Sequence, residues 1–475
     1  MQKFWKKVLV GVCCGALLGS FAACGKGAEE PTSAEVTEAP EATKEPEATK
    51  TPEATKAPEA TKTPEATKAP EVTKAPVVTE APEVTAIPEV TSLKEAAADC
   101  GFSFGTVISA YSKYDLSYKM MLMDEFNSVT AANEMKAYSM LDQNASQWSA
   151  DGMPAINFTQ ADEIVSLAEL LGIGVRGHVL VWDAYMCDWF FREDYKNNSP
   201  YVDEATMKAR LKYYIETVIT HFETEFPGVV YCWDVVNEAV GDAEGDYNPA
   251  DERHMRVYRE GGENLFYQYI GNDYVELSFL YARNAVEALQ EKNPEVDIKL
   301  FYNDFNAFFP EKREAICKLI ESINEYDTEE SGQPRRLCDG VGMQGYIGGY
   351  GTQQGCLDKE LIPMIKEAVL RYADMGMEVQ ITEMAVRNYS RDKQEIRKHE
   401  EFYTELIRTL VELNSGDEKP LTCIAIWGLT DLKDIPKSDY TYKLNGPYSG
   451  LFTADYQVKK VFSDVYEMLK NKQNE

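Results

Sequence analysis

The chain lacks the paired cysteines that mark a metal centre or a disulfide-stapled fold. It has ten cysteines in 475 residues, and its long C-terminal part contains no C-x-x-C pair. That part holds an odd number of them, at Cys100, Cys187, Cys232, Cys317, Cys338, Cys356 and Cys423. Neither a zinc-type site nor a full disulfide framework follows from this spacing. We expect most of these cysteines to be small apolar residues of the core.

Positive charge is also scarce. The sequence has 48 Lys and Arg against 79 Asp and Glu, which gives a formal net charge of −31. Such a charge argues against nucleic acid and against anionic membrane surfaces as partners. It fits a secreted, soluble protein and selects no substrate.

The apolar run at the N-terminus is too short to cross a bilayer comfortably. Three lysines (Lys3, Lys6 and Lys7) precede sixteen residues from Val8 to Ala23, and Cys24 follows. We therefore predict a secretion signal over residues 1–24. Its end, Phe21-Ala22-Ala23-Cys24, resembles the bacterial lipoprotein cleavage box, in which the cysteine becomes lipid-modified. We expect an extracellular protein held at the bacterial cell surface by lipid on Cys24; the alternative is an ordinary signal with an incidental cysteine.

Aromatic residues are absent from the segment that follows. Residues 25–92 are rich in Pro, Thr, Glu and Lys, and from Ala39 to Ser92 nine copies of a six-residue pattern close to A-P-E-A-T-K follow one another. Proline in every copy opposes both helix continuation and strand pairing. No copy has enough apolar surface to offset the entropy of ordering it. We predict a disordered, extended spacer that holds a domain away from a surface.

The remaining residues, 93–475, alternate between strand and helix patterns. Eight apolar, β-branched runs predict strands, at Phe102–Ser109, Phe126–Asn133, Gly174–Trp182, Val230–Glu238, Lys299–Asp304, Val341–Tyr346, Glu378–Glu383 and Cys423–Leu429. Apolar residues at 3.6-residue spacing predict helices at Gln160–Leu171, Thr206–Phe222, Asp273–Glu291, Glu311–Glu325, Leu361–Met375, Lys393–Leu413 and Lys459–Lys470. This alternation predicts an α/β fold with parallel strands, and eight units closing on themselves make a (β/α)8 TIM barrel.

Unusual polar or aromatic residues at the C-terminal ends of these strands favour a closed barrel over an open sheet. In a barrel all of those ends surround one mouth, where active sites are built. An open, doubly wound sheet would scatter them along one edge and would usually carry a Gly-rich phosphate turn after its first strand. The sequence has no such turn.

Two of these strands end on a glutamate. Glu238 closes the run from Trp233, and Glu383 closes the run from Val379. Burying such charges is costly unless chemistry requires them. Two carboxyl groups facing one cavity can cut a glycosidic bond, one as a proton donor and the other as an ionised nucleophile or base. Either glutamate alone could simply cap or pair at a strand end, but the pair, together with Asn237, favours glycoside hydrolysis.

The motifs around these glutamates resemble those of glycoside hydrolase family 10, the endo-β-1,4-xylanase family. The matching stretches run through nearly all of 93–475: Phe126–Thr130, Asn133–Lys136, Arg176–Trp182, Trp233–Ala239, Tyr302–Asn306, Gly342–Gln344, Ile381–Glu383 and Trp427-Gly428. The resemblance implies that Glu238 is the general acid/base and Glu383 the nucleophile. It also implies that a set of polar and aromatic residues lines the sugar subsites, namely Asn133, Lys136, His178, Trp182, Asn237, Gln344 and Trp427.

The mechanism implied by the resemblance is double displacement with retention of anomeric configuration on xylan or a related β-1,4-linked polysaccharide. Retaining enzymes hold their two carboxyl groups about 5–5.5 Å apart. No metal and no organic cofactor is needed, and we expect a monomer.

The sequence departs from the family pattern around the nucleophile. Tyr346 stands where the family has a histidine, and Ala385 stands where it has an acidic residue. Because a single loss would leave the other partner unpaired in a buried site, losing both is easier to tolerate. Tyr346 can still donate a phenolic hydrogen bond, and we predict that it orients Glu383.

Other departures leave the substrate open. The family's W-H-S-Q run is Trp182-Asp183-Ala184-Tyr185, Ala132 and Ala137 replace a glutamate and an aromatic residue, and a second tryptophan is not evident at 432–438. A relative that acts on another β-1,4-glycan or on decorated arabinoxylan is one alternative, and a glycan-binding barrel without turnover is another. The polar loop from Gly241 to about Ile270 either shapes substrate binding or is a solvated excursion. Tyr346–Gly351 predicts a flexible aromatic rim, and His221 and His399 read as ordinary helix residues.

Overall fold

The computed structural model describes residues 92–472 apart from 244, 260–261, 330–331 and 352–356. The predicted signal over 1–24, with Cys24, and the predicted spacer up to residue 91 lie outside the described residues. Ser92, which the sequence assigns to the spacer, is the N-cap of the first described helix, α2 (Leu93–Asp99). Its hydroxyl accepts a hydrogen bond from the Glu95 N–H, which satisfies a donor at the start of the helix.

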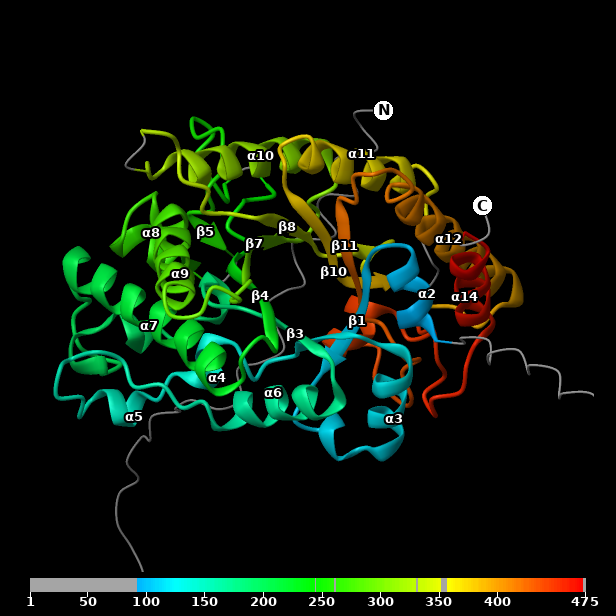
Figure 1. Cartoon of the computed structure of the whole chain (residues 1–475), viewed down its shortest axis with the longest axis horizontal. Helices are drawn as coiled ribbons and strands as arrows, with labels where there is room; N and C mark the ends of the chain where they lie inside the picture. The colour runs from blue at the N-terminus through cyan, green and yellow to red at the C-terminus, as the bar shows by residue number, and fades with distance from the viewer. Residues whose placement is uncertain (1–91, 244, 260–261, 330–331, 352–356, 473–475) are drawn as a thin grey trace, which may run out of the picture. The chain divides into compact units, whose positions relative to one another are not determined.

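Parallel strands close into a barrel, as the sequence predicts (Figure 1). Their order is β1-β2-β3-β4-β7-β8-β10-β11, and β11 returns to pair with β1. The bounds are β1 (Ser103–Ile108), β2 (Ser128–Ala131), β3 (Gly174–Gly177), β4 (Val230–Asn237), β7 (Lys299–Asp304), β8 (Gly340–Met343), β10 (Glu378–Val386) and β11 (Leu421–Ile426). Each overlaps one predicted strand, and the predicted (β/α)8 barrel is confirmed.

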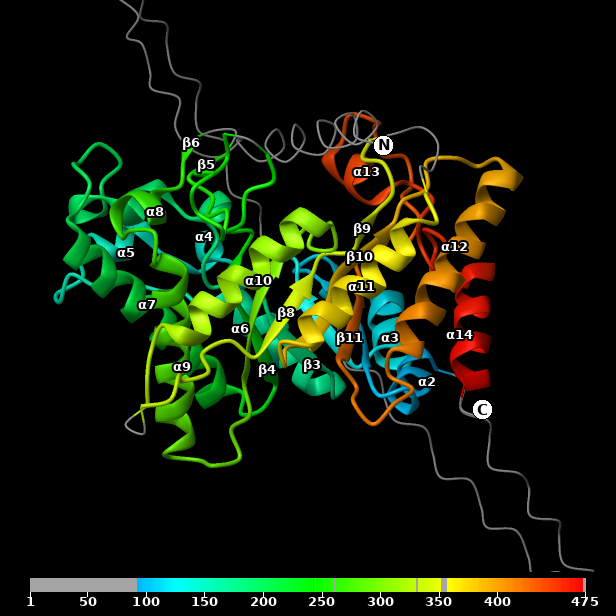
Figure 2. The same cartoon turned by 90° about the horizontal axis from the view of Figure 1, so that it is seen from above.

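Long helices surround the strands, and each of the seven predicted from apolar periodicity is present. They are α6 (Thr159–Leu171), α7 (Glu204–Glu225), α9 (Tyr274–Gln290), α10 (Pro310–Glu325), α11 (Leu361–Ala373), α12 (Lys393–Glu412) and α14 (Lys460–Lys472). Aspartate N-caps start two of them, since Asp203 accepts from the Thr206 N–H and Asp392 from the Gln394 N–H. Figure 2 shows α10, α11, α12 and α14 following one another along one side of the barrel. Within the described part of the chain, no helix combines the length and apolar character that a bilayer crossing needs.

Shorter helical segments occupy the connections. They are α3 (Leu116–Glu125), α4 (Ala137–Met140), α5 (Gln143–Ser146), α8 (Leu265–Tyr269) and α13 (Tyr440–Asn445), with single 3₁₀ turns at Ser112–Tyr114, Asp183–Tyr185, Asp188–Phe191 and Glu193–Tyr195.

The core lies between the barrel and its helices. Trp233 of β4 is fully buried and its ring lies 5.6 Å from that of Phe222 on α7. A side chain at Gly177 on the neighbouring strand would meet the Trp233 ring at 2.4 Å, so only glycine fits there. Because side chains alternate along a strand, the next residue, Asp234, points to the barrel interior instead. Four of the cysteines, Cys232, Cys317, Cys338 and Cys423, are buried, as expected.

The loops at the C-terminal ends of the strands are partly ordered into secondary structure. The long connection after Glu238 contains a hairpin of β5 (Tyr258–Arg259) and β6 (Gly262–Glu263) followed by α8. Figure 2 shows this hairpin, β9 (Tyr346–Ile347) and α13 on the same side of the barrel. The aromatic rim predicted over Tyr346–Gly351 therefore begins with a short strand. Strand β10 runs further than β8, and its free edge pairs Ala385 with Tyr346 and Val386 with Ile347.

Candidate active site

The residues predicted to form the site lie where the barrel strands end, around one mouth. Asn133 and Lys136 come after β2, His178 and Trp182 after β3, Asn237 at the end of β4 with Glu238 next, Gln344 after β8, Tyr346 in β9, Glu383 within β10 and Trp427 directly after β11.

A chain of side-chain amides joins the two glutamates. Asn303 Nδ2 donates to Glu383 Oε1 at 3.3 Å and to Asn237 Oδ1 at 2.9 Å. Gln344 Nε2 donates to the same Asn237 oxygen at 3.2 Å and to Glu238 Oε1 at 3.0 Å. Both glutamate residues are 7% exposed, so they share one nearly closed polar site.

Glycine at position 342 makes room for the middle of this chain. A Cβ there would lie 2.3 Å from Asn303 Oδ1 and 2.9 Å from Thr382 Cγ2. The same Asn303 oxygen accepts from the Thr382 hydroxyl at 2.7 Å. The amide orientation follows from the bond to Glu383, because an ionised carboxylate only accepts and must face the Nδ2 donor. The glycine of β8 therefore lets β7 place its amide between the two carboxylates.

The backbone of Glu238 is held in an unusual conformation. Its φ is +56°, in the left-handed region that residues other than glycine seldom adopt. The Glu238 N–H donates to the Asn303 carbonyl at 2.9 Å, and its own carbonyl accepts from Arg256 Nε at 3.1 Å. Such a conformation costs on the order of 1 kcal/mol and persists only where its surroundings fix it, which is typical of functional positions.

Three N–H groups from separate loops converge on the Glu238 carboxylate. Trp182 Nε1 and Arg259 Nη1 donate to Oε2 at 3.2 and 3.1 Å. Gln344 Nε2 donates to Oε1, as described above. The carboxylate is therefore fixed in direction at the mouth of the barrel.

Glu383 is surrounded differently. The Tyr346 hydroxyl donates to Glu383 Oε2 at 2.6 Å, which is the contact predicted from the sequence. Burial raises the pKa of Glu383, and the charge of Glu238 adds to this, whereas His178 and the bond from Tyr346 work to lower it. The two carboxyl groups therefore have different hydrogen-bond donors around them.

The sequence profile described as "Glycosyl hydrolase family 10" matches residues 92–468. The chain belongs to glycosyl hydrolase family 10. Endo-1,4-β-xylanase A of Thermotoga maritima is 32% identical over 356 residues, which are 72% of this chain and 27% of that protein. A β-1,4-xylanase of Dictyoglomus thermophilum is 29% identical over 379 residues, 77% of this chain and 87% of that protein.

A solved structure shows the same fold. It contains the CBM22-1 and GH10 modules of endo-1,4-β-D-xylanase 10B of Clostridium thermocellum, complexed with xylohexaose. It matches this chain with a TM-score of 0.66 and 27% identity, over 81% of this chain and 68% of that chain. The family 10 chain described here is therefore a glycoside hydrolase with the barrel of its relatives.

Tyr346 takes the place of the family's histidine, and Arg387, two residues beyond Ala385, lies behind it. The Arg387 guanidinium lies 5.6 Å from the centroid of the Tyr346 ring and donates to the carbonyls of Leu444 and Gly348. It places a positive charge behind the tyrosine that donates to Glu383.

Replacing Tyr346 with phenylalanine is expected to lower kcat by about 10- to 100-fold, because a hydrogen bond to a charged group contributes about 1.5–3 kcal/mol. The Tyr346 contact lowers the pKa of Glu383, so its loss raises that pKa and moves the acid limb of the pH–rate profile to higher pH. Initial rates across pH measure both effects. The exposed Tyr111 supplies a matched control, Tyr111→Phe. An unchanged turnover number would show that Tyr346 does not orient the nucleophile.

The other residues predicted to line the sugar subsites make several aromatic contacts. Lys136 Nζ donates to Asn133 Oδ1 at 3.1 Å and lies 5.2 Å from the Trp182 ring and 4.9 Å from the Tyr185 ring. Burial lowers the pKa of Lys136 to about 8, although the carboxylates of the site oppose this. The Trp182 and Tyr185 rings lie 4.3 Å apart, so Tyr185 covers part of Trp182. Trp427 is only partly buried, and its backbone N–H donates to Met384 O at 2.8 Å.

Three residues of the site have no role assigned to them from the sequence. Asn303 joins the carboxylates, and Arg259 and Asp183 form an ion pair beside Glu238. Asn303 carried a usable signal, since it is a polar residue in a buried strand. Asp183 stood out only as a departure from the family motif. Arg259 is one of several charged residues in the polar loop after Glu238, and nothing in the sequence marks which of these charges turns toward the site.

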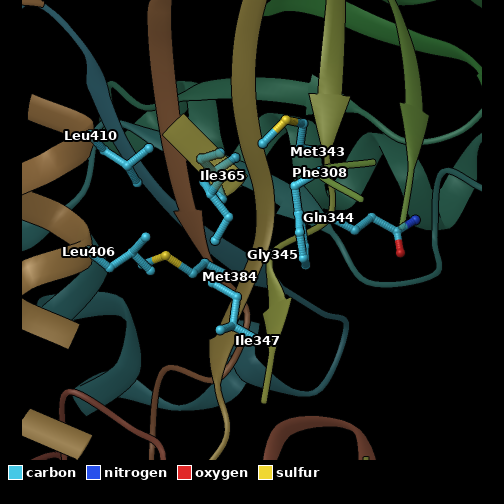
Figure 3. A pocket seen from close by; sticks show the side chains of 10 residues that line it. Phe308, Met343, Gln344, Gly345, Ile347, Ile365, Met384, Leu406 and Leu410 are labelled. Carbon is cyan, nitrogen blue, oxygen red and sulfur yellow. The ribbon is translucent and has the colours of Figure 1, made fainter. Parts of the chain in front are cut away.

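His221 and His399 bond to other parts of the protein, and the nearby pocket is apolar. His399 bonds to Val386 O at 2.9 Å and burial lowers its pKa to about 4, while His221 bonds to Asp162 at 2.7 Å. Figure 3 shows a pocket between β8, β10 and the helices α11 and α12, lined by Met343, Ile365, Met384, Leu406 and other apolar side chains, with the Gln344 side chain pointing away from them. Such a lining offers no partners for sugar hydroxyls. The residues described contain no group of three or more His, Cys, Asp or Glu arranged around a metal position.

Proposed function

We propose that the chain is a retaining endo-1,4-β-xylanase. The observation that carries this is the pair Glu238 and Glu383, two carboxylates with different hydrogen-bond donors, joined by one chain of amides. The family and its xylanase relatives give the substrate class, and the barrel mouth supplies the place. The chain spans 87% of the Dictyoglomus thermophilum xylanase but only 27% of the Thermotoga maritima enzyme, so the proposal concerns the activity of this barrel.

In the first step Glu383 attacks the anomeric carbon while Glu238 protonates the oxygen of the leaving sugar. The bond from that carbon to the glycosidic oxygen breaks, a bond to a Glu383 oxygen forms, and the proton of Glu238 leaves with the released chain. In the second step ionised Glu238 takes a proton from water, whose oxygen replaces Glu383 at the anomeric carbon. Two inversions restore the original configuration.

An unsatisfied donor in the site supports sugar binding. Asn237 Nδ2 is buried and has no hydrogen-bond partner among the described residues, although its Oδ1 accepts two bonds. An orphaned buried donor is costly, so a ligand oxygen at this point would stabilise the site. A sugar hydroxyl bound beside Glu238 supplies such an oxygen. In this proposal Asn133, Lys136, His178, Trp182, Gln344 and Trp427 form the remaining sugar contacts.

Product analysis tests the function. The purified protein is expected to release short oligosaccharides from xylan, with proton NMR showing the β-anomer first, whereas Glu238→Ala releases almost none. Parallel reactions on arabinoxylan and cellulose distinguish the alternatives. Preferred release from either of these would move the substrate from plain xylan to a decorated or different β-1,4-glycan. Binding to xylan without any new reducing ends would overturn the enzymatic proposal.

We propose separately that lipid on Cys24 tethers the enzyme outside the cell. The support is the sequence alone: a basic start, a short apolar run and Phe21-Ala22-Ala23-Cys24, followed by the proline-rich repeats. Replacing Cys24 with alanine is expected to shift the protein from the membrane fraction to the medium, as an immunoblot of both fractions would show. Retention in the membrane fraction would refute the tether.

A further inference from the structure

Arg259 bridges the proposed acid/base to a second carboxylate. Its Nη1 donates to Glu238 Oε2 at 3.1 Å. Its Nε and Nη2 donate to the two oxygens of Asp183 at 3.0 and 2.8 Å, a bidentate pair. The side chains of Arg259, Asp183 and Glu238 are 11%, 5% and 9% exposed, so the interaction is little screened by solvent.

The second carboxylate keeps the guanidinium in place whatever the charge on Glu238. When Glu238 carries a proton, Arg259 and Asp183 still form a neutral pair. When Glu238 is ionised, Arg259 faces two anions. Burial alone would lower the pKa of Arg259, but the negative charges of Asp183 and Glu238 outweigh burial and raise that pKa. Arg259 is therefore a fixed cation throughout a reaction in which its neighbour gains and loses a proton.

The hairpin that carries Arg259 is anchored at its base. The Asn264 N–H donates to Val257 O at 3.1 Å, and Asn264 Nδ2 donates to Arg256 O at 3.0 Å. Arg256 in turn donates to the carbonyls of Glu238 and Val240. The loop after Glu238 thus folds back, so that Arg259, 21 residues later, contacts the Glu238 side chain. Arg256 of the same loop holds the Glu238 backbone carbonyl.

We propose that Arg259 is a positioning residue for the acid/base and that Asp183 tunes it; this rests on the proposed function. A cation on Glu238 opposes protonation in the first step, which needs an acid. It favours the ionised carboxylate in the second step, when Glu383 is esterified and Glu238 must act as base. Asp183 offsets part of the positive charge and leaves the acid form accessible. Together, Arg259 and Asp183 therefore keep Glu238 in one position and let it act as acid in the first step and as base in the second.

A merely structural tie between the hairpin and the turn Asp183–Tyr185 makes different predictions. It would change stability and activity together, on every substrate and at every pH. A positioning role acts on proton transfer. A substitution that removes a positioning residue therefore lowers the rate most on substrates whose leaving group needs a proton. It also shifts the pH–rate profile, in a direction set by the sign of the charge removed.

The main test compares Arg259→Met with wild type on xylan and on an aryl β-xylobioside with a dinitrophenolate leaving group. We expect kcat on xylan to fall about 10- to 100-fold, the range of one charged hydrogen bond. We expect the pre-steady-state burst of dinitrophenolate from the aryl substrate to change less than about 3-fold, since this leaving group needs no proton. Arg259→Lys should recover part of the loss, because it returns the charge without the fork. Equal losses on both substrates would overturn the proposal.

Opposite shifts in the alkaline limb of the pH–rate profile give a second readout. Arg259→Met removes a cation beside the acid, so the limb moves to higher pH. Asp183→Asn leaves the cation less compensated, so the limb moves to lower pH. Shifts in the same direction, or none in either variant, would contradict the tuning role. Because the two variants are independent, one that fails to fold leaves the other to decide.

Arg253→Met is the matched control. This arginine lies in the same loop but pairs with Asp251 and Glu276, and it makes no contact with either catalytic glutamate among those the structure records. Its activity and pH profile should equal those of wild type. A wild type that is inactive on both substrates would refute the xylanase function itself. An active wild type with an unaffected Arg259→Met variant would refute only the role of Arg259.

Discussion

Replacing Glu383 with alanine is expected to lower kcat on xylan by on the order of 10⁴- to 10⁶-fold, the scale on which enzymes lose turnover with their nucleophile. The variant cannot form the covalent intermediate, and the amide chain through Asn303 then ends at an empty position. Initial rates of reducing-end release measure the loss. The melting temperature should change little, because removing Glu383 also relieves a buried charge whose pKa burial raises.

Azide separates the roles of the two glutamates. In Glu383→Ala a small anion can occupy the vacated face and attack the anomeric carbon once, giving a glycosyl azide of inverted configuration. In Glu238→Ala the nucleophile still forms the intermediate on substrates with good leaving groups, and azide replaces water in the second step, giving the retained azide. Retained azide from Glu383→Ala, or inverted azide from Glu238→Ala, would reverse the assignment. NMR of the isolated azides gives the configuration directly.

The fold was predictable because the signal repeats along the chain. Each of eight apolar runs is followed by a segment with helical periodicity. The barrel prediction therefore holds even if the bounds of any one element are wrong. Errors gathered at the strand ends near the mouth. The run from Phe126 to Asn133 forms a strand only over Ser128–Ala131, because its last residues leave the ladder to serve the site. The opposite error occurred at β10, which continues past Glu383 to Val386 since β9 offers it another partner.

The sequence predicts the site residues that belong to the barrel strands, but not those that belong to the loops. Glu238 directly follows β4, and Glu383 lies in β10 just beyond Ile381, the last residue of that strand that pairs with β8. The register of the barrel brings these positions together whatever the loops do. Asp183 and Arg259 are 76 residues apart and meet only because the hairpin folds back over the turn after Trp182. Sequence periodicity carries no information on that approach. Asp183 departs from the family motif because it pairs with Arg259, and no local sequence pattern identifies Arg259 as its partner.

Replacing Asp234 with asparagine is expected to destabilise the folded barrel by about 3–5 kcal/mol, because it leaves a buried arginine without its counter-charge. Arg176 donates to both Asp234 oxygens, at 2.9 and 2.6 Å, and both side chains are almost completely buried. His178 Nδ1 also contacts Asp234 Oδ2 at 2.9 Å, so the same change loosens a residue of the proposed sugar site. Urea unfolding followed by tryptophan fluorescence measures the change in the free energy of unfolding.

The pH dependence of stability gives this prediction a second test. Burial would raise the pKa of Asp234, but Arg176 and His178 outweigh it and the pKa is lowered from 3.8. A lowered pKa means that the stabilisation is present above the unfolded-state value and is lost as pH falls through the folded-state value. Asparagine does not titrate, so the variant should lose that part of the acid dependence. The double change Arg176→Met with Asp234→Leu removes both charges and should recover part of the stability, with the remainder lost at Gln380 and His178, whose bonds to the pair are broken. If Asp234→Asn unfolds at the same urea concentration as the wild type, the buried pair does not stabilise the barrel, and the ion pair would have to be explained by its hold on His178 alone.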